Sequence, residues 1–186
     1  NGGEALVVTA AILFELTLPL TPAQVLWINM ATSSTLGLAL AFELPESDVM
    51  QRPPRDPREP LLSWFFLWRI MMVSVLMMTG ALGLFLPELH QGASLETART
   101  MAVSAVVMAE MFYLLNSRYV YKSVLSREGL LGNRYVPIVI AACAALQLAY
   151  VHTGPLQKVF GSTDLTAFEW LKVCLAGMLV FMIAEL

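Results

Sequence analysis

Six apolar stretches, separated by more polar segments, constrain this chain more than any other feature of its sequence. They cover roughly residues 3–18, 25–42, 61–86, 100–115, 135–151 and 166–186. A helix that crosses a bilayer needs about 20 apolar residues, and a longer stretch can span with a tilt. None of the stretches alternates apolar and polar residues with a period of two, which disfavours a transmembrane β-barrel. The sequence therefore predicts an all-α integral membrane protein built as a six-helix bundle.

The composition supports a membrane protein and excludes several other classes. Hydrophobic residues make up 58% of the 186 residues and charged residues 13%, whereas soluble domains are about half apolar and a quarter charged. The net charge of −3 offers no basic patch for phosphates, so we expect the lipid bilayer as a partner and no nucleic acid. Cys143 and Cys174 match no metal or redox spacing. A large soluble core and a secreted disulfide scaffold are likewise excluded.

The distribution of basic residues predicts the orientation in the membrane. The connections over residues 43–60 and 117–134 carry seven Lys and Arg residues, while the other three connections carry only Lys158, with Arg99 at the border. Basic residues accumulate in cytoplasmic loops, so both of these connections and both chain termini are expected in the cytoplasm. We expect a multi-pass protein of the plasma membrane.

The first apolar stretch begins with an amide and a carboxylate on one helix face. Asn1 and Glu4 are three residues apart, and residues at this spacing are neighbours on a helix. Amide and carboxylate oxygens are ligands of hard cations, but the same groups also cap free N–H groups at a helix start. A cation site and a helix cap are both consistent with this pattern. A tight turn at residues 18–22 predicts that the first two stretches run antiparallel, so that their polar residues can face each other.

The second stretch contains an unusual number of polar side chains for a membrane helix. Asn29, Thr32 and Ser33 lie on one stripe, and the hydroxyl run continues through Thr35 to a glycine. Such a run can unwind, because hydroxyls satisfy freed backbone groups and unwound carbonyls can coordinate cations. We therefore expect unwinding near Asn29–Thr35. Small polar residues also support close helix packing, which is the alternative interpretation.

A further acid lies inside the fourth stretch. Glu110 is about ten residues into the predicted helix, and a carboxylate at this depth is a functional hypothesis by default because it is costly to bury. The alternative is a buried acid that is protonated or satisfied by hydrogen bonds. Glu110 is therefore a candidate intramembrane acid next to the metal-ligand candidates Asn1, Glu4, Asn29, Thr32 and Ser33.

Two motifs resemble a known family. They are Leu-Thr-Pro-Ala-Gln-Val-Leu-Trp-Ile-Asn-Met over residues 20–30, followed by Leu-Ala-Leu-Ala-Phe-Glu over 38–43, and Val-Met-Gln-Arg-Pro-Pro-Arg over 49–55. Together they resemble cation-transporting P-type ATPases of the calcium-pump and sodium-pump class, from the fifth to the tenth transmembrane helix. The resemblance implies that Asn1 and Glu4 on the fifth helix, and Asn29, Thr32 and the position of Ser33 on the sixth, are ion ligands. The transported cation would be calcium or another ion.

This sequence departs from the family pattern at two places. Calcium and sodium pumps carry an aspartate at the position of Ser33, and calcium pumps supply an acid on the eighth helix at a place where Val120 is the nearest residue here. Glu110 precedes that place by about three helical turns. Two missing carboxylates argue against a site for two calcium ions and favour weak calcium binding or a single cation.

The resemblance also implies a division of labour within a longer protein. The chain begins at Asn1 without Met, and Mg-ATP would be used only by upstream domains, since no Asp-Lys-Thr-Gly run is present. Residues 1–60 would form an ion-ligand hairpin with a proline-rich cytoplasmic loop, and residues 61–186 a four-helix supporting region, within one membrane domain. We expect the transport region of an ATP-driven cation pump. The rival hypothesis is a non-catalytic channel or scaffold whose polar residues only pack helices.

Overall fold

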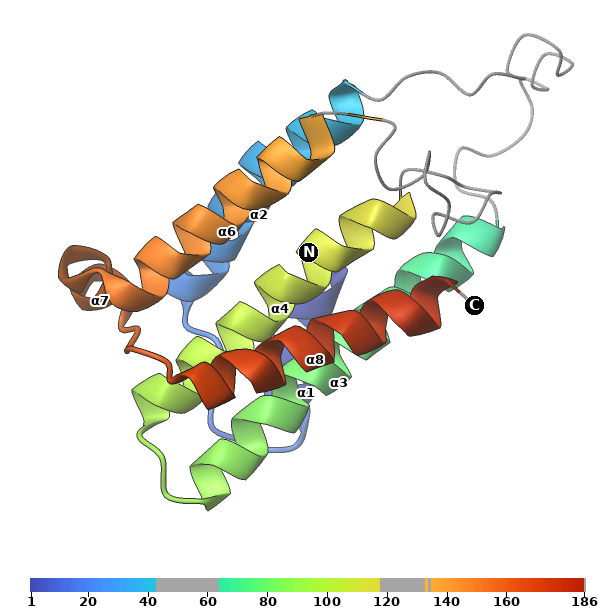
Figure 1. Cartoon of the computed structure of the whole chain (residues 1–186). Coiled ribbons are helices and arrows are strands. Elements are labelled where there is room, and N and C mark those ends of the chain that lie inside the picture. The colour runs from blue at the N-terminus through green and yellow to red at the C-terminus, as the bar shows by residue number, and fades with distance from the viewer. Residues whose placement is uncertain (43–63, 118–132, 134, 186) are drawn as a thin grey trace, which may run out of the picture.

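The structure is a computed structural model, which describes residues 1–42, 64–117, 133 and 135–185. The described residues form seven helices: α1 (Gly2–Leu13), α2 (Pro22–Ala41), α3 (Trp64–His90), α4 (Leu95–Ser117), α6 (Tyr135–His152), α7 (Gly154–Phe160) and α8 (Ala167–Glu185). The long helices lie alongside one another, and the short helix α7 connects α6 towards α8 at one end of the bundle (Figure 1). The all-α prediction is confirmed for these residues, and α7 is an additional helix that it did not include.

Six of the helices correspond to the six predicted apolar stretches. Within the described residues, α3, α4, α6 and α8 are long and apolar enough to cross a membrane. Helix α1 has only 12 residues, and α2 has 20 residues but includes an amide and a run of hydroxyls that lower its apolar character. Four of the six predicted spans are therefore confirmed by length and composition. Of the other two helices, α1 is apolar but short, and α2 is less apolar.

Helix α1 ends at Leu13, five residues before the predicted end of the first stretch. The N–H of Leu16 donates to the carbonyl of Ala11 at 2.8 Å, and the N–H of Glu15 donates to the carbonyl of Ile12 at 3.3 Å. These two bonds satisfy the last carbonyls of the helix, and they require a residue with positive φ after the C-cap. Glu15 adopts that conformation, with a φ of 53°.

The start of α2 follows from local sequence chemistry. The hydroxyl of Thr21 accepts the N–H of Gln24 at 3.2 Å, and the Gln24 side-chain oxygen accepts the N–H of Thr21 at 3.0 Å. This reciprocal pair satisfies two N–H groups at the helix start. Pro22 occupies the first turn, where its missing N–H has no cost.

Helix α4 forms the centre of the bundle. It is buried along most of its length and packs against α3, α8, α2 and α6. Small side chains such as Ala98, Ala102 and Ala105 allow neighbouring helices to approach closely. A side chain at Gly177 of α8 would overlap Met108 of α4, so glycine is needed where these two helices meet.

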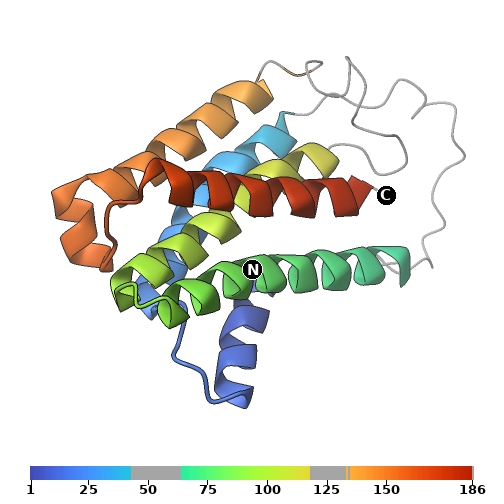
Figure 2. The ribbon, with the colours of Figure 1, turned by 60° about the horizontal axis from the view of Figure 1, so that its bottom comes forward.

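The first two helices do not form the packed hairpin that the sequence predicts. Helix α1 packs against α3, whereas α2 packs chiefly against α6 and α4. Figure 2 shows α1 projecting at an angle from α3 while α2 lies behind α4. The residues between the two helices allow α1 to diverge from α2, and the hydrogen bond between Glu4 and Asn29 links them.

Helix α2 is continuous through Asn29–Thr35, so the expected unwinding is not present in this structure. The hydroxyls of Thr32 and Thr35 donate to the carbonyls of Ile28 and Ala31, at 2.9 and 2.5 Å. Each bond returns to the carbonyl four residues earlier, where the helical backbone bond is also made. The hydroxyl hydrogen bonds are therefore made in addition to the backbone hydrogen bonds of the helix and do not replace them.

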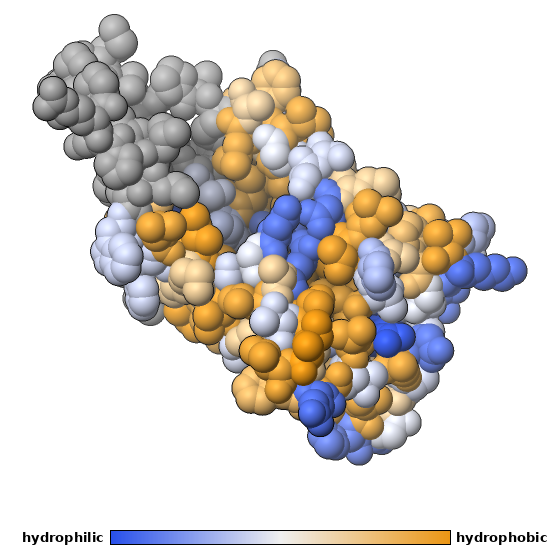
Figure 3. Space-filling view, turned by 180° about the vertical axis from the view of Figure 1, so that it is seen from behind, coloured by the Kyte–Doolittle hydropathy of each residue, from blue (hydrophilic) through white to orange (hydrophobic). Residues whose placement is uncertain are grey.

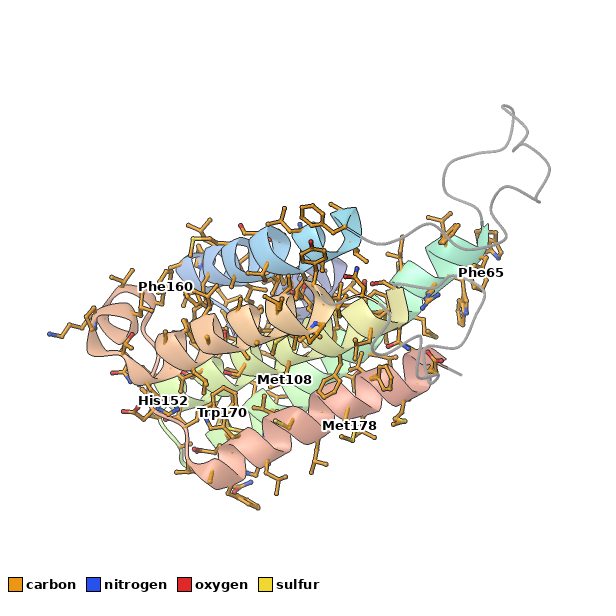
Figure 4. The ribbon with its side chains drawn as sticks, turned by 45° about the horizontal axis from the view of Figure 1, so that its top comes forward. Phe65, Met108, His152, Phe160, Trp170 and Met178 are labelled. Carbon is orange, nitrogen blue, oxygen red and sulfur yellow. The ribbon has the colours of Figure 1, made fainter. Side chains whose placement is uncertain are left out.

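At one end of the bundle, a small polar cluster connects α6 with α8 and with the segment that precedes α8. The Nδ1 atom of His152 lies 2.8 Å from Asp164, and Trp170 Nε1 donates to His152 Nε2 at 3.3 Å. The side chains of His152 and Trp170 lie next to each other where α6 and α8 approach (Figure 4). The hydrogen bond with His152 lowers the pKa of Asp164 below its usual value, so this carboxylate is charged at neutral pH.

Much of the outer surface is apolar. Large hydrophobic side chains are exposed on several helices, including Leu26, Trp68, Ile138 and Leu179. Figure 3 shows one face on which hydrophobic residues form most of the surface and hydrophilic residues gather in separate groups. A soluble protein rarely exposes such large apolar patches, and this surface is suited to contact with lipid.

Candidate cation site between α1, α2 and α4

The carboxylate of Glu4 on α1 contacts the amide of Asn29 on α2. The Asn29 Nδ2 atom donates to Glu4 Oε2 at 2.8 Å and to the carbonyl of Val25 at 3.0 Å. Glu4 is only 4% exposed, and its other oxygen, Oε1, has no hydrogen-bond partner among the described residues. Burying a carboxylate oxygen without a partner is costly, so this atom points to a role beyond packing.

Four of the six predicted site residues line one cavity of about 390 Å³. Asn1 comes from the start of α1, Thr32 and Ser33 from α2, and Glu110 from α4. The tertiary structure thus brings together residues that are up to 109 positions apart in the sequence. Further polar side chains on its wall are Ser74, Tyr113 and Ser117.

Glu110 is the carboxylate of this cavity. Its side chain interacts with that of Thr32 and with the charge of Glu4, so the two acids and the α2 hydroxyl lie close together. The Glu110 Oε2 atom is buried and has no hydrogen-bond partner within the described part of the chain. Two neighbouring carboxyl groups, each with an unpartnered oxygen, thus lie inside a largely apolar protein. A bound cation would stabilise the charged form of these groups.

The ligand types define which cations fit. No group of three or more His, Cys, Asp or Glu side chains that could hold a metal occurs in residues 1–42, 64–117, 133 and 135–185. Coordination would therefore combine the two carboxylates with amide, hydroxyl and backbone oxygens. All of these are hard oxygen ligands, which suit calcium and similar cations and do not suit soft metals.

The contacts at the start of α1 bear on the capping interpretation of Asn1 and Glu4. Asn1 is the N-cap residue of α1, but its side chain makes no capping hydrogen bond, and the carboxylate of Glu4 is directed to Asn29. The capping interpretation is therefore not supported for these two side chains. The hydroxyl of Thr35 donates to the carbonyl of Ala31, and Thr35 is absent from the described cavity lining, whereas Ser33 is exposed and lines the cavity.

The structure adds most to the sequence prediction at Glu110. The family pattern directed attention to the neighbourhood of Val120, which lies outside the described residues, while Glu110 reaches the same cavity as Asn1 and Ser33. Sequence reasoning missed Ser74 and Tyr113 as cavity residues. Ser74 lies within an apolar run on α3. Its hydroxyl among apolar neighbours is the one sequence signal that could have identified it as a cavity residue.

Comparison with known proteins shows the family of this chain. The family model for "Cation transporting ATPase, C-terminus" matches residues 17–186. The chain is 40% identical over 173 residues to the probable cation-transporting ATPase F of Mycobacterium tuberculosis, covering 93% of the chain and 19% of that protein. It is 32% identical over 174 residues to a calcium-transporting ATPase of Bacillus subtilis, with the same two coverages.

A human relative, the calcium-transporting ATPase type 2C member 1, is 29% identical over 179 residues, which are 96% of this chain and 19% of that protein. The chain thus spans about a fifth of the length of these relatives. The family model covers most of the chain, from residue 17 to residue 186. The protein therefore belongs to the cation-transporting P-type ATPases, of which this chain is the C-terminal membrane region.

Proposed function

We propose that this chain is the ion-transport region of an ATP-driven pump and that the cavity between α1, α2, α3 and α4 holds the transported cation. The observation that carries the proposal is the convergence of hard oxygen ligands from three helices. Glu4 and Asn29 form a bonded pair, and Asn1, Thr32, Ser33 and Glu110 line the adjoining cavity. The two unpartnered carboxylate oxygens supply the charge that a cation needs.

Calcium is the first candidate for the transported ion. The relatives from Bacillus subtilis and human are named as calcium-transporting, and oxygen ligands suit this cation. Calcium takes six to eight oxygens, and its affinity depends on the number of charged ligands. With Ser33 in place of an acid, we propose one bound cation per cycle.

The cavity also suggests the direction of access. It extends from Glu110 to Leu40 and Ser117, which lie at the ends of α2 and α4. With the orientation expected from the basic residues, this end of the bundle faces the cytoplasm. Upstream domains that bind Mg-ATP and become phosphorylated would move α1 and change the position of Asn1 and Glu4. In this proposal residues 1–60 supply most of the ion ligands, and residues 61–186 form the supporting region and contribute Glu110.

Cation-dependent phosphorylation of the full-length pump tests this function directly. The parent protein in vesicles is expected to form a phosphoenzyme from ATP only when Ca²⁺ is added, with saturation at one ion per phosphoenzyme. Radioactive Ca²⁺ binding, measured on the same preparation, gives this ratio. Phosphorylation that is insensitive to Ca²⁺, Mn²⁺, Na⁺ and K⁺ alike would favour the channel or scaffold hypothesis.

Accessibility of engineered cysteines tests the orientation. A cysteine at Ser47 or Gly129, both outside the described residues, is expected to react with an impermeant maleimide only from the cytoplasmic side. A cysteine at Gln91, which is exposed between α3 and α4, is expected to react only from outside. The test requires the full-length pump with its accessible native cysteines, including Cys174, replaced. The reverse pattern of labelling would contradict the orientation.

A further inference from the structure

A chain of buried hydrogen bonds links three helices beside the cation cavity. The Trp27 Nε1 atom on α2 donates to Gln147 Oε1 on α6 at 3.1 Å. The Gln147 Nε2 atom in turn donates to Ser104 Oγ on α4 at 3.0 Å. All three side chains are at most 2% exposed, and such networks are directional and costly to break in a dry interior. The linked helices α2 and α4 are those that carry Thr32, Ser33 and Glu110.

The indole of Trp27 is held by aromatic contacts as well. It stacks on Tyr150 with ring centroids 5.2 Å apart and contacts Phe160 at 5.1 Å. Phe160 lies on α7 at the end of the bundle where α2 begins (Figure 4), and its carbonyl accepts the Gln24 side-chain amide at 3.2 Å. The first half of α2 is therefore fixed on the side that faces α6 and α7.

This fixed side lies opposite the ligand side of α2. Asn29 follows Trp27 by two residues, which places it about 200° further round the helix. The remaining buried contacts of α2 are largely apolar, for example Ile28, Ala31 and Ala39, and apolar contacts are not directional. The hydrogen bond of Trp27 is thus a directional contact that can set the rotation of α2 about its axis, and with it the direction of the ligands. The bonds of Gln24 and Asn29 are directional as well, but only the bond of Trp27 continues through Gln147 to α4.

We propose that Gln147 is a positioning residue for cation binding, which holds α2 through Trp27 and α4 through Ser104 at the rotation that the cation site requires. This inference rests on the proposed function, since it concerns the affinity of the same site. Gln147, Trp27 and Ser104 are absent from the described lining of the cavity, so their effect is transmitted through the helices. The amide is suited to this role because it accepts from one helix and donates to the other.

Two variants of the full-length pump separate positioning from general stability. Gln147→Met has a similar volume but removes both hydrogen bonds, and Ser104→Ala removes only the link to α4. We expect the Ca²⁺ concentration for half-maximal phosphorylation to rise about tenfold in Gln147→Met and about threefold in Ser104→Ala, since each hydrogen bond contributes modestly. The maximal phosphoenzyme level is expected to stay within twofold of the unmodified pump. In the double variant, the added effect of Ser104→Ala should disappear.

Ser162→Ala is the matched control. Its hydroxyl donates to the carbonyl of Tyr150 on α6 at 2.6 Å in a buried position, and this bond involves neither α2 nor α4. The control should lower the thermal unfolding midpoint without changing the half-saturating Ca²⁺ concentration. Unchanged Ca²⁺ dependence in folded Ser104→Ala and Gln147→Met overturns the positioning role alone. If Gln147→Met does not fold, the Ca²⁺ dependence of Ser104→Ala alone tests the positioning role. An unmodified pump without Ca²⁺-dependent phosphorylation overturns the proposed function and, with it, this inference.

Discussion

Replacing Glu4 by glutamine in the full-length pump is expected to raise the Ca²⁺ concentration for half-maximal phosphorylation by about tenfold to a hundredfold. The reason is the loss of one of two carboxylates at the site, since calcium affinity follows the number of charged ligands. A glutamine oxygen can still accept the amide of Asn29, which the Glu4 carboxylate accepts at 2.8 Å. The substitution therefore removes the charge with little change in shape. The measurement is the Ca²⁺ dependence of phosphoenzyme formation in vesicles.

Two further variants complete this test. Glu110→Gln is expected to have an effect of similar size, because Glu110 lines the cavity and interacts with the charge of Glu4. Glu15→Gln removes a carboxylate from the exposed turn that follows the same helix and should leave the Ca²⁺ dependence unchanged. If Glu4→Gln folds and inserts normally but keeps the original Ca²⁺ dependence, Glu4 is not a cation ligand.

Introducing an acid at Ser33 is expected to act in the opposite direction. Ser33 lines the cavity, and an aspartate there would add a third carboxylate to Glu4 and Glu110. We expect the Ca²⁺ affinity to increase about tenfold, because a charged oxygen replaces a neutral one. The added charge also raises the cost of the empty site, so the unfolding midpoint without Ca²⁺ should fall while that with Ca²⁺ is retained. Calcium binding and thermal unfolding with and without the ion measure both effects.

The neighbouring residue provides the control for this variant. Ser34 is exposed on the same helix but is absent from the described lining of the cavity. Ser34→Asp should therefore leave Ca²⁺ affinity unchanged, although it adds the same charge one position away. Equal effects of the two substitutions, or none from Ser33→Asp in a folded protein, would show that Ser33 does not face the cation.

Much of the fold could be predicted from local sequence patterns. The length of the apolar runs determines the helices, because a backbone in lipid must satisfy its own hydrogen bonds. The start of α2 follows from Thr21, Pro22 and Gln24, whose capping interactions involve only near neighbours. The end of α1 could not be predicted in this way, since it depends on a positive φ at Glu15, a residue that does not favour it.

The candidate site was predicted in its residue types but not in its arrangement. The sequence by itself determined that Asn1, Glu4, Asn29, Thr32 and Ser33 carry amide, carboxylate and hydroxyl oxygens at helical spacing, since side-chain chemistry and spacing are local properties. Only the tertiary structure decided that α1 packs on α3, that α2 stays helical, and that Glu110 reaches the same cavity. The chain of bonds from Trp27 to Gln147 and Ser104 was also a tertiary outcome. These features depend on the rotation of each helix about its axis, which is set by contacts between residues distant in the chain, and those contacts leave no periodic trace in the sequence.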